Sequence, residues 1–418
     1  MKFEDYRIIE ELKRSIDGLG FKKPTDIQFK AIPAIIRGED VLAIAQTGTG
    51  KTAAFAIPVI DQIQRLKQSN TRFKGVRCVV MTPTHELAIQ VAGVFKQLSK
   101  YTKLNILAIH GGVDQDPQIE ALKKGVDILV ATPGRLFDLR AQGHLVIERT
   151  EILILDEADH MLDLGFIDDI KDLMRHLPKK RQTLFFSATI NPKIKKLAYS
   201  LVTNPIRIQI SPKDPVSKNI DHTVAFIEMD DKRFFLEHLI KENEQRKLLI
   251  FVRTKVRAER VKKAMDRVNI DSDTIHSDKT DEERVKTIER FKEGTNKILI
   301  ATDVSARGID IPNIEMVVNY DLPDVSENYV HRVGITGRGR NKGKAITFCS
   351  TEEKEMLDEI QTFLDSEIQT VKLAKDAYSS VVKQSEEGLE DVDDLMKRIE
   401  DFDEASKQMK KKRKNRKK

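Results

Sequence analysis

Residues 41–52 have the sequence VLAIAQTGTGKT, and the helix-periodic run AAFAIPVIDQIQ follows at once. An apolar strand, a glycine-rich loop and a helix in this order are the context of a phosphate-binding P-loop, whereas the loop string alone also occurs by chance. Gly48 and Gly50 let backbone N–H groups turn toward phosphate oxygens. Lys51 offers a positive charge to the outer phosphates, and Thr52 offers a hydroxyl to Mg²⁺. The predicted nucleotide-binding residues of this loop are Gln46, Thr47, Gly48, Thr49, Gly50, Lys51 and Thr52.

Short β-rich runs alternate with helix-periodic segments on either side of this loop, and the alternation occurs twice. The first series is VLAIA, VRCVVMTP, ILAIHGG, ILVATP, EILILDEAD and TLFFSAT, and the second is HTVAFIEM, KLLIFVRT, DTIHS, KILIATD, MVVNYD and GKAITFCS. Such alternation predicts parallel α/β sheets. A chain of 418 residues also exceeds the size of one ordinary core. We therefore predict an α/β fold of two similar domains, at 1–207 and 220–368, joined by a proline-containing linker at 208–219.

The C-terminal segment, 369–418, is predicted to be a charged tail. Residues 386–404 are strongly acidic, and residues 410–418 (KKKRKNRKK) are almost wholly basic. A basic run attracts phosphate polyanions, but a solubilising tail is an equally good interpretation. The net charge of +6 lies largely in this run.

Two cysteines and the N-terminus indicate the compartment. Cys78 and Cys349 lie in apolar runs and are expected to be buried free thiols. The first residues, MKFEDYRIIEELKR, lack an apolar signal region, and no stretch approaches the ~20 apolar residues of a membrane span. A cytoplasmic protein without a membrane partner is expected.

An acidic motif follows the apolar run EILIL. Carboxylates at the end of a parallel strand reach the edge of the sheet where ligands bind. Asp156 is therefore a predicted Mg²⁺ ligand together with Thr52, and Glu157 is predicted to orient and deprotonate the attacking water. Alone, an acidic quartet is usually a solvated turn, but the P-loop makes a metal and water site the better interpretation.

These motifs, in this order, resemble the DEAD-box family of ATP-dependent RNA helicases over residues 3–348. The resemblance implies two tandem RecA-like domains, each a parallel sheet flanked by helices, that use ATP and Mg²⁺ and bind RNA. Residues 21–28 (FKKPTDIQ) are similar to the Q motif, which implies that Phe21, Thr25 and Gln28 contact the adenine side of ATP. A carboxamide suits adenine because it offers one donor and one acceptor.

The resemblance also implies a coupling group and an RNA-binding group. The coupling residues, which relate nucleotide state to RNA binding, are Asp159, Ser187, Thr189 and His331. The RNA-binding residues come from loops after strands: Pro83, Thr84, Gly112, Thr132, Pro133, Gly134, Arg135, Arg253, Thr254 and Thr302. None of them is an aromatic platform, so backbone contacts with little sequence specificity are expected. By itself, each of these segments is an ordinary turn or helix cap.

Two segments of the second domain, DVSARGID at 303–310 and HRVGITGR at 331–338, resemble motifs that reach ATP when the domains close. Asp303 and Asp310 are implied to contact the nucleotide, with Asp303 at the ribose, and Arg338 is implied to be the arginine finger. The complete catalytic set is then Lys51, Asp156, Glu157 and Arg338.

Three positions depart from the family pattern. Ile335 replaces an arginine of the last motif, so hydrolysis is expected to be slowed rather than absent, because an arginine finger contributes ~10³ to 10⁵ in turnover and Arg338 remains. His85 replaces an arginine of the PTREL motif, and Asp281 replaces a glutamine that usually faces RNA, which leaves Arg284 alone. Weaker RNA coupling or tolerated drift are both compatible with these changes.

The main hypothesis is a monomeric RNA-dependent ATPase that locally unwinds short duplexes or remodels RNA–protein complexes. One alternative is an ATP-gated RNA clamp with slow turnover because of Ile335, and another is a duplex-DNA translocase. The text around Phe166 and at 319–323 (NYDLP) is similar to bacterial RhlE-type members, which implies ribosomal or RNA-degradation partners.

Overall fold

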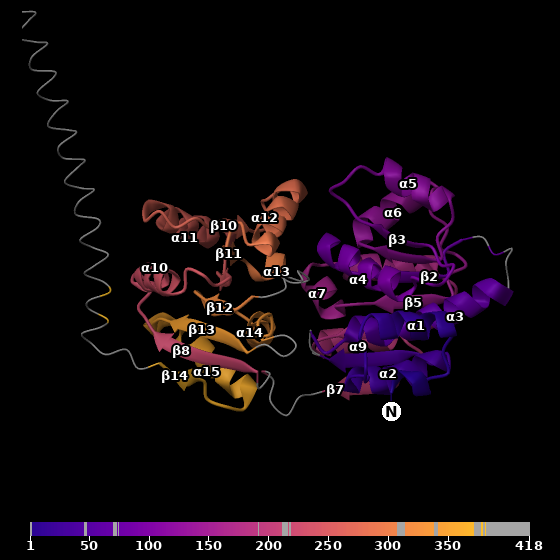
Figure 1. Cartoon of the computed structure of the whole chain (residues 1–418), viewed down its shortest axis with the longest axis horizontal. Helices are drawn as coiled ribbons and strands as arrows, with labels where there is room; N and C mark the ends of the chain where they lie inside the picture. Colours follow the sequence, from indigo (N-terminus) through magenta and orange to yellow (C-terminus); the bar gives the residue numbers. More distant parts are fainter. Residues whose placement is uncertain are drawn as a thin grey trace, which may run out of the picture.

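The computed structural model shows two α/β lobes side by side (Figure 1). It describes residues 2–45, 48–69, 73, 75–190, 192–210, 216, 219–306, 314–337, 342–371, 378 and 381, without the side chains of residues 281, 304 and 306. Lobe 1 extends from η1 to β7, and lobe 2 extends from β8 to β14. Each lobe holds one seven-stranded sheet within these residues.

Lobe 1 contains η1 (Phe3–Asp5), α1 (Glu10–Gly18), α2 (Asp26–Ile36), β1 (Val41–Ala45), α3 (Lys51–Ser69), β2 (Cys78–Met81), α4 (His85–Leu98), β3 (Ile106–Ile109), α5 (Asp116–Lys123), β4 (Ile128–Ala131), α6 (Pro133–Ala141), β5 (Ile152–Leu155), α7 (Ala158–Asp163), α8 (Ile167–His176), β6 (Gln182–Ser187), α9 (Pro192–Leu201) and β7 (Ile206–Ile210).

Lobe 2 contains β8 (Ile220–Phe226), α10 (Lys232–Glu242), β9 (Leu248–Phe251), α11 (Lys255–Arg267), β10 (Asp273–Ile275), α12 (Asp281–Glu293), β11 (Ile298–Ala301), α13 (Asp303–Ala306), β12 (Met316–Asn319), α14 (Ser326–Val333), β13 (Gly343–Cys349), η2 (Thr351–Glu353), α15 (Lys354–Leu364) and β14 (Gln369–Thr370).

The two sheets share one topology. Their strand orders are β3-β4-β2-β5-β6-β1-β7 and β10-β11-β9-β12-β13-β8-β14, and the strand pairings in both are parallel. Each position in one sheet therefore has a counterpart in the other, such as β1 and β8, or β3 and β10. Because all strands of a parallel sheet end at the same edge, the loops that follow them gather there. The predicted α/β class with two tandem parallel sheets is confirmed.

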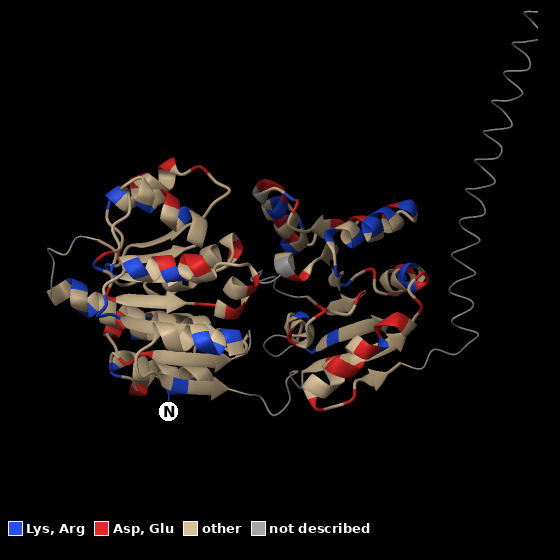
Figure 2. Ribbon diagram, turned by 180° about the vertical axis from the view of Figure 1, so that it is seen from behind, with Lys and Arg blue, Asp and Glu red and all other residues tan. Residues whose placement is uncertain are grey.

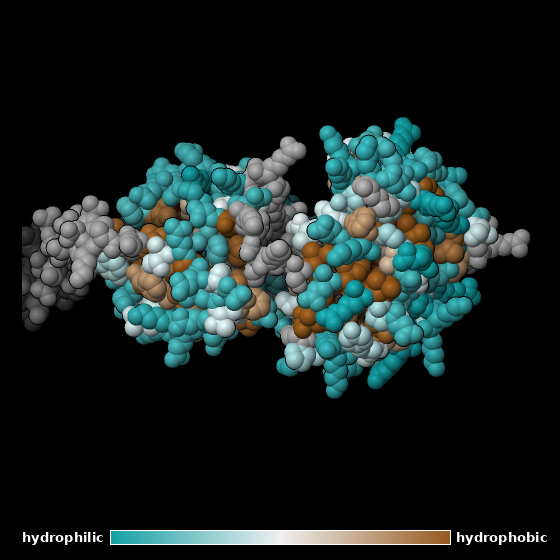
Figure 3. All heavy atoms as spheres, turned by 90° about the horizontal axis from the view of Figure 1, so that it is seen from below, coloured by the Kyte–Doolittle hydropathy of each residue, from teal (hydrophilic) through white to brown (hydrophobic). Residues whose placement is uncertain are grey.

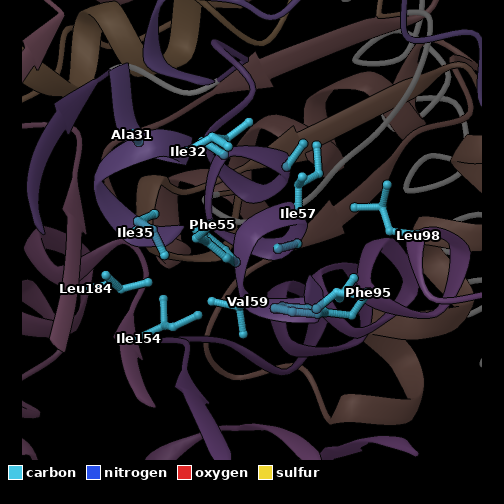
Figure 4. Close-up of a cluster of buried hydrophobic side chains, with 14 of the residues drawn as sticks. Ala31, Ile32, Ile35, Phe55, Ile57, Val59, Phe95, Leu98, Ile154 and Leu184 are labelled. Carbon is cyan, nitrogen blue, oxygen red and sulfur yellow. The ribbon is translucent and has the colours of Figure 1, made fainter. Parts of the chain in front are cut away.

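Burial explains why these segments form strands. Residues of β1, β2, β4, β5 and β6 in lobe 1 are buried throughout, as expected for a parallel sheet covered by helices on both faces. Figure 4 shows Phe55 of α3 and Phe95 of α4 packed beside Ile154 and Leu184 of the sheet. The rings of Phe55 and Phe186 lie 5.1 Å apart, edge to face. This core fixes α3, and hence the loop that precedes it.

The lobes reach slightly beyond the predicted boundaries. Strand β7 crosses residue 207 and pairs with β1, while β14 lies in the predicted tail and pairs with β8. Farther along, the Tyr378 hydroxyl accepts a hydrogen bond from the Glu228 backbone N–H at 3.2 Å and donates one to Asp231 at 2.6 Å. Its ring lies 4.8 Å from that of Phe235. Most of the linker, and the acidic and basic runs of the tail, lie outside the described residues.

The distribution of charged and apolar residues, and the burial of both thiols, agree with the predictions from the sequence. Lys, Arg, Asp and Glu of both signs are spread over the helices, while the strands carry few of them (Figure 2). Seen from the side of α2 and β7, lobe 1 also exposes apolar atoms (Figure 3), and the exposed apolar residues of these two elements are Phe29 and Ile206. Cys78 and Cys349 are free and buried, as predicted. In the part of the chain that the structure describes, no helix is long and apolar enough to span a membrane.

Candidate nucleotide site and nucleic-acid interface

The P-loop lies between β1 and α3, at the carboxyl edge of the lobe 1 sheet. Gly48 and Gly50 have φ values of 80° and 91°, which L side chains rarely adopt. Lys51 is the first residue of α3; it is 7% exposed, and its Nζ has no hydrogen-bond partner among the described residues. A buried ammonium without a partner is costly, so it indicates a site made for an anion. Gln46 and Thr47 lie outside the described residues.

The Q-motif residues hold this loop in place. Thr25 donates its hydroxyl to the Thr49 carbonyl at 2.8 Å, and the Gln28 Nε2 donates to the Gly50 carbonyl at 3.2 Å. The Gln28 Oε1 accepts from the Thr25 backbone N–H at 3.0 Å, which also caps α2. A Cβ on Gly50 would lie 2.5 Å from the Gln28 Nε2, and the φ of 91° would strain any other residue there. Gln28 therefore positions the P-loop in this structure, and its contact with adenine stays a prediction, as does that of Phe21, which is 38% exposed.

Asp156 and Glu157 follow β5 directly and face the lysine. Asp156 is 2% exposed, and burial raises its pKa to about 7, although the positive charge of Lys51 acts in the opposite direction. Burial acts to raise the pKa of Glu157 as well. The contact with His160 and the positive charges of Lys51 and His331 have the larger effect and lower this pKa to about 2. Glu157 is thus ionised at neutral pH. Its backbone is left-handed, with φ 50° and ψ 50°, a conformation that costs energy and is typical of functional sites.

These residues fit the magnesium ion that the motifs imply. Among the described residues no cluster of three or more His, Cys, Asp or Glu side chains is arranged to hold a metal. Mg²⁺ does not need one, since it usually takes one or two carboxylates and completes its shell with phosphates and water. Asp156 follows β5 and Thr52 follows Lys51 in α3, and both supply oxygen ligands of the required kind.

The predicted coupling residues meet between β5 and β6. The Asp159 Oδ2 accepts hydrogen bonds from the backbone N–H groups of Ala188 and Thr189 at 3.2 and 3.1 Å, and from the Thr189 hydroxyl at 3.2 Å. The Ser187 hydroxyl instead donates to the Thr189 carbonyl within its own turn. Three hydrogen bonds therefore connect the acidic motif to the turn after β6. His331 of lobe 2 lies close enough to act on the Glu157 charge.

Asp303 forms an ion pair within lobe 2, and its contact with the ribose stays a prediction. Both of its carboxylate oxygens accept hydrogen bonds from Arg332, at 2.6 and 2.7 Å. Arg332 is 1% exposed and also donates to the Asp321 carbonyl at 2.7 Å. This bidentate pair joins α13 to α14. Sequence reasoning missed Arg332, although a charged residue within the apolar helix run YVHRV was a signal of it.

The remaining predicted residues of lobe 2 near ATP are only partly visible. Asp310 and Arg338 lie outside the described residues. Ile335 does not point into solvent; it packs, partly buried, against the core of lobe 2. The next residue, Thr336, is 1% exposed and donates to the Ile314 carbonyl at 2.7 Å. Ile335 thus serves as an apolar contact within lobe 2.

The predicted RNA-binding threonines stand at helix starts in both lobes. Thr84 caps α4 by accepting from the Leu87 N–H at 3.3 Å, and Thr254 caps α11 in the same way at 3.1 Å. Thr132 precedes α6, whose first two residues are Pro133 and Gly134, and Thr302 precedes α13. Helix N-termini carry partial positive charge and unsatisfied N–H groups. The carboxyl edges of both sheets therefore present groups suited to phosphate oxygens.

The two predicted RNA-binding arginines are engaged with protein groups. Arg135 donates to the Val113 carbonyl at 2.8 Å and so holds the loop that contains Gly111 and Gly112. Arg253 pairs with Glu353 at 3.0 Å and with Asp324 at 3.2 Å. Both arginines shape the interface in this structure, and direct contact with RNA stays a prediction for them.

Arg284 also has a partner that the sequence did not predict. Its Nη2 lies 2.8 Å from the Glu86 Oε1, so α12 of lobe 2 is paired with α4 of lobe 1 across the gap that Figure 1 shows. Both side chains are shielded, with 18% and 16% exposure. Arg284 therefore joins the lobes beside the interface. The side chain of Asp281 lies outside the described residues.

Comparisons with known proteins agree with this geometry. Residues 25–197 match the family model of the DEAD/DEAH box helicase, and residues 231–340 match that of the helicase conserved C-terminal domain. The ATP-dependent RNA helicase RhlB of Pseudomonas putida is 38% identical over 88% of this chain and 93% of its own length. The DEAD-box ATP-dependent RNA helicase RhpA of Helicobacter pylori is 38% identical over 91% and 76%. Among solved structures, S. cerevisiae Dbp5 bound to RNA and ADP BeF3 has a TM-score of 0.79 at 30% identity, covering 93% of this chain and 99% of Dbp5.

Proposed function

Because this chain belongs to the DEAD/DEAH box helicase family, we propose that it is an ATP-dependent RNA helicase whose lobe 1 binds ATP and Mg²⁺ and whose two lobes bind RNA together. Relatives named as RNA helicases match nearly the whole chain. The RhlE-type resemblance, ribosomal or RNA-degradation partners, the monomeric state and the cytoplasmic location remain predictions.

The observation that carries the proposal is the Lys51 ammonium, which follows the P-loop and has no hydrogen-bond partner among the described residues. It lies near Asp156, whose pKa is raised, and Glu157, whose pKa is lowered. Lys51 attracts the outer phosphates and stabilises the negative charge that moves to them during hydrolysis. Glu157 is held ionised, so it can accept a hydrogen bond from the attacking water and orient it. Asp156 and Thr52 would hold Mg²⁺, which neutralises phosphate charge when bound.

RNA dependence follows from the division of the interface between the lobes. The helix starts after β2 and β4 lie in lobe 1, and those after β9 and β11 lie in lobe 2. A single RNA strand that contacts all four helix starts therefore draws the two lobes together. His331 is already near Glu157 in this structure, and RNA bound to both lobes would hold it there. Hydrolysis is thus promoted when RNA is bound. The hydrogen bonds of Asp159 to Thr189 would transmit the nucleotide state to the turn after β6.

The test is steady-state ATPase activity with and without single-stranded RNA, beside the variant Ile335→Arg. We expect clear stimulation of the native protein by RNA and a small effect of the variant, because Ile335 packs in lobe 2 and Arg338 remains. A native protein nearly inactive with RNA, combined with a gain of about tenfold or more in Ile335→Arg (about 1.4 kcal/mol of barrier), would favour the slow clamp. Stimulation by duplex DNA above that by RNA would favour the translocase.

A further inference from the structure

Helix α7 contains one buried polar side chain whose hydrogen-bonding groups are not satisfied. Two of its buried residues, Ala158 and Met161, pack in the apolar core of lobe 1, and Asp159 accepts three hydrogen bonds from the turn after β6. His160 is 3% exposed, yet neither of its ring nitrogens completes a hydrogen bond within the described residues. A buried ring with two unmade hydrogen bonds is costly, and an apolar side chain of similar size would avoid this cost.

The ring of His160 faces the carboxylate that the proposed function uses to orient water. The His160 Nδ1 lies 3.5 Å from the Glu157 Oε2, three positions away at the start of α7. This separation exceeds the usual length of a hydrogen bond. Catalytic hydrogen bonds are often long in the absence of substrate and shorten when the reacting groups are bound. His160 is thus placed to hold one carboxylate oxygen of Glu157 during hydrolysis.

The other groups that act on Glu157 do not orient its carboxylate in the same way. Burial raises the pKa of Glu157, and among the groups that lower it to about 2 His160 acts most strongly, ahead of Lys51 and His331. A lysine ammonium is a compact point charge, which attracts a carboxylate without selecting one of its two oxygens. A ring N–H next to one oxygen does select, because it donates in a single direction. The other oxygen is then left for the water.

We propose that His160 is a positioning residue for Glu157: its Nδ1–H holds the Glu157 Oε2, so that the other carboxylate oxygen faces the attacking water. The proposal rests on the proposed ATPase function of this site. Because a carboxylate only accepts, the Nδ1 carries the proton in this contact. A catalytic base is commonly oriented by a third group that does not itself touch the substrate. His160 acts in this way through Glu157, and Glu157 alone contacts the water.

The test is the steady-state ATPase activity of the full chain with saturating single-stranded RNA, in native protein, His160→Met and His160→Asn. Methionine fills the volume without a donor, whereas asparagine places an amide N–H at the position of Nδ1. In His160→Met, kcat should fall about tenfold, less than the ~10²–10⁴ that a complete general base contributes, while KM for ATP stays unchanged. His160→Asn should recover most of the kcat. The matched control is His176→Met, which removes a partly exposed histidine of α8 and should keep the native activity.

Two further measurements separate positioning from a structural role. His160→Met should unfold at the native temperature or above it, because the substitution removes an unsatisfied buried ring. His160→Asn should unfold at a lower temperature, because asparagine is a poor helix former. Activity and stability should therefore change in opposite directions in the two variants. In the Glu157→Gln background, measured in single turnovers, His160→Met should cause little further loss, because His160 acts through Glu157.

The outcomes distinguish the positioning role from the proposed function. The positioning role is contradicted by a native kcat in His160→Met, by a loss of kcat as large in His160→Asn, or by an undiminished further loss in the Glu157→Gln background. It is also contradicted if the unfolding temperature of His160→Met falls together with its kcat. A native protein without RNA-stimulated ATPase activity contradicts the proposed function instead.

Discussion

Lys51 and Lys232 occupy the same place in the two lobes, and their surroundings are opposite. Each is the first residue of the helix that follows the sixth strand of its sheet, β1 or β8. The Lys51 Nζ has no hydrogen-bond partner among the described residues. The Lys232 Nζ donates to the Glu353 Oε2 at 2.5 Å and to the Tyr320 carbonyl at 2.7 Å. One lobe leaves its lysine open to a ligand, and the other neutralises it internally.

The loops before these lysines differ accordingly. Lobe 1 has a glycine-rich loop, whereas residues 226–231 of lobe 2 (FIEMDD) contain no glycine and three acids. The Glu228 N–H, in the segment that precedes Lys232, donates to the Tyr378 hydroxyl. Acidic side chains and an occupied N–H both oppose phosphate. One topology thus serves as an ATP site in lobe 1 and as a stabilised support in lobe 2.

The largest expected effect is the loss of ATPase activity when Lys51, but not Lys232, is replaced. Lys51→Met should lower RNA-stimulated ATPase turnover by about 10³-fold, because the charge that stabilises the transferred phosphoryl group is lost. The free energy of unfolding should change by less than about 1 kcal/mol, since the burial cost of the ammonium and its attraction to Asp156 and Glu157 oppose each other. Steady-state kinetics and denaturant titration measure both. A loss of several kcal/mol of stability would mean that Lys51 is a structural residue like Lys232.

The reciprocal variant should change stability rather than chemistry. Lys232→Met removes the buried ammonium that pairs with Glu353, which then keeps only Arg253 as a cationic partner. Because the Glu353 charge is then only partly compensated, the free energy of unfolding should fall by about 2–3 kcal/mol. Nucleotide affinity should stay within about twofold, because lobe 1 is untouched. The double variant Lys232→Met with Glu353→Gln should recover part of the loss, and a loss that remains undiminished would argue against the ion pair as its cause.

The same contrast shows what the sequence predicts well. Each of the twelve segments named from β-rich patterns overlaps one of the strands β1–β6 or β8–β13, and only β6 and β8 begin before their segment. Strands β7 and β14 were missed, because IRIQI adjoins the proline-containing linker and Gln369–Thr370 is only two residues long and exposed. Both strands lie at a sheet edge and leave most of their residues at least partly exposed, so their sequences carry a weak apolar pattern.

The site residues fall into two groups, those that local motifs predicted and those that depend on contacts between distant parts of the sequence. Local motifs predicted the P-loop and the acidic motif after β5, because residues close in sequence determine the conformation of each segment. Pairs far apart in sequence were not predictable in this way: Asp303 with Arg332, Arg253 with Glu353, and Glu86 with Arg284. Each of these forms only when the fold brings two helices or loops together, and no local signal specifies a partner.

A smaller effect is expected where the lobes meet. Glu86→Gln or Arg284→Met should weaken RNA-stimulated ATPase activity about threefold to tenfold at subsaturating RNA, because a shielded charged hydrogen bond contributes ~1–2 kcal/mol to closure. Arg290→Met is the matched control, since it removes an arginine of the same helix that pairs with Asp273 within lobe 2. The exchange of Glu86→Arg with Arg284→Glu should restore activity. Equal losses in Arg290→Met would show that α12 rather than the pair is responsible.

The smallest expected effect concerns the histidine of lobe 2. Hydrogen bonding from His276 lowers the pKa of Glu259 from 4.5 to about 2, with Thr274 and Lys279 adding to the effect. A carboxylate with a depressed folded-state pKa stabilises above its unfolded value, and this stability is lost as the pH falls from 4.5 toward 2. The Glu259 side chain is 39% exposed, so Glu259→Gln should cost under about 1 kcal/mol at pH 7. Denaturant titrations across this pH range should show the difference between native protein and Glu259→Gln shrinking with acid. A difference that is constant with pH would mean that the carboxylate charge of Glu259 does not hold His276.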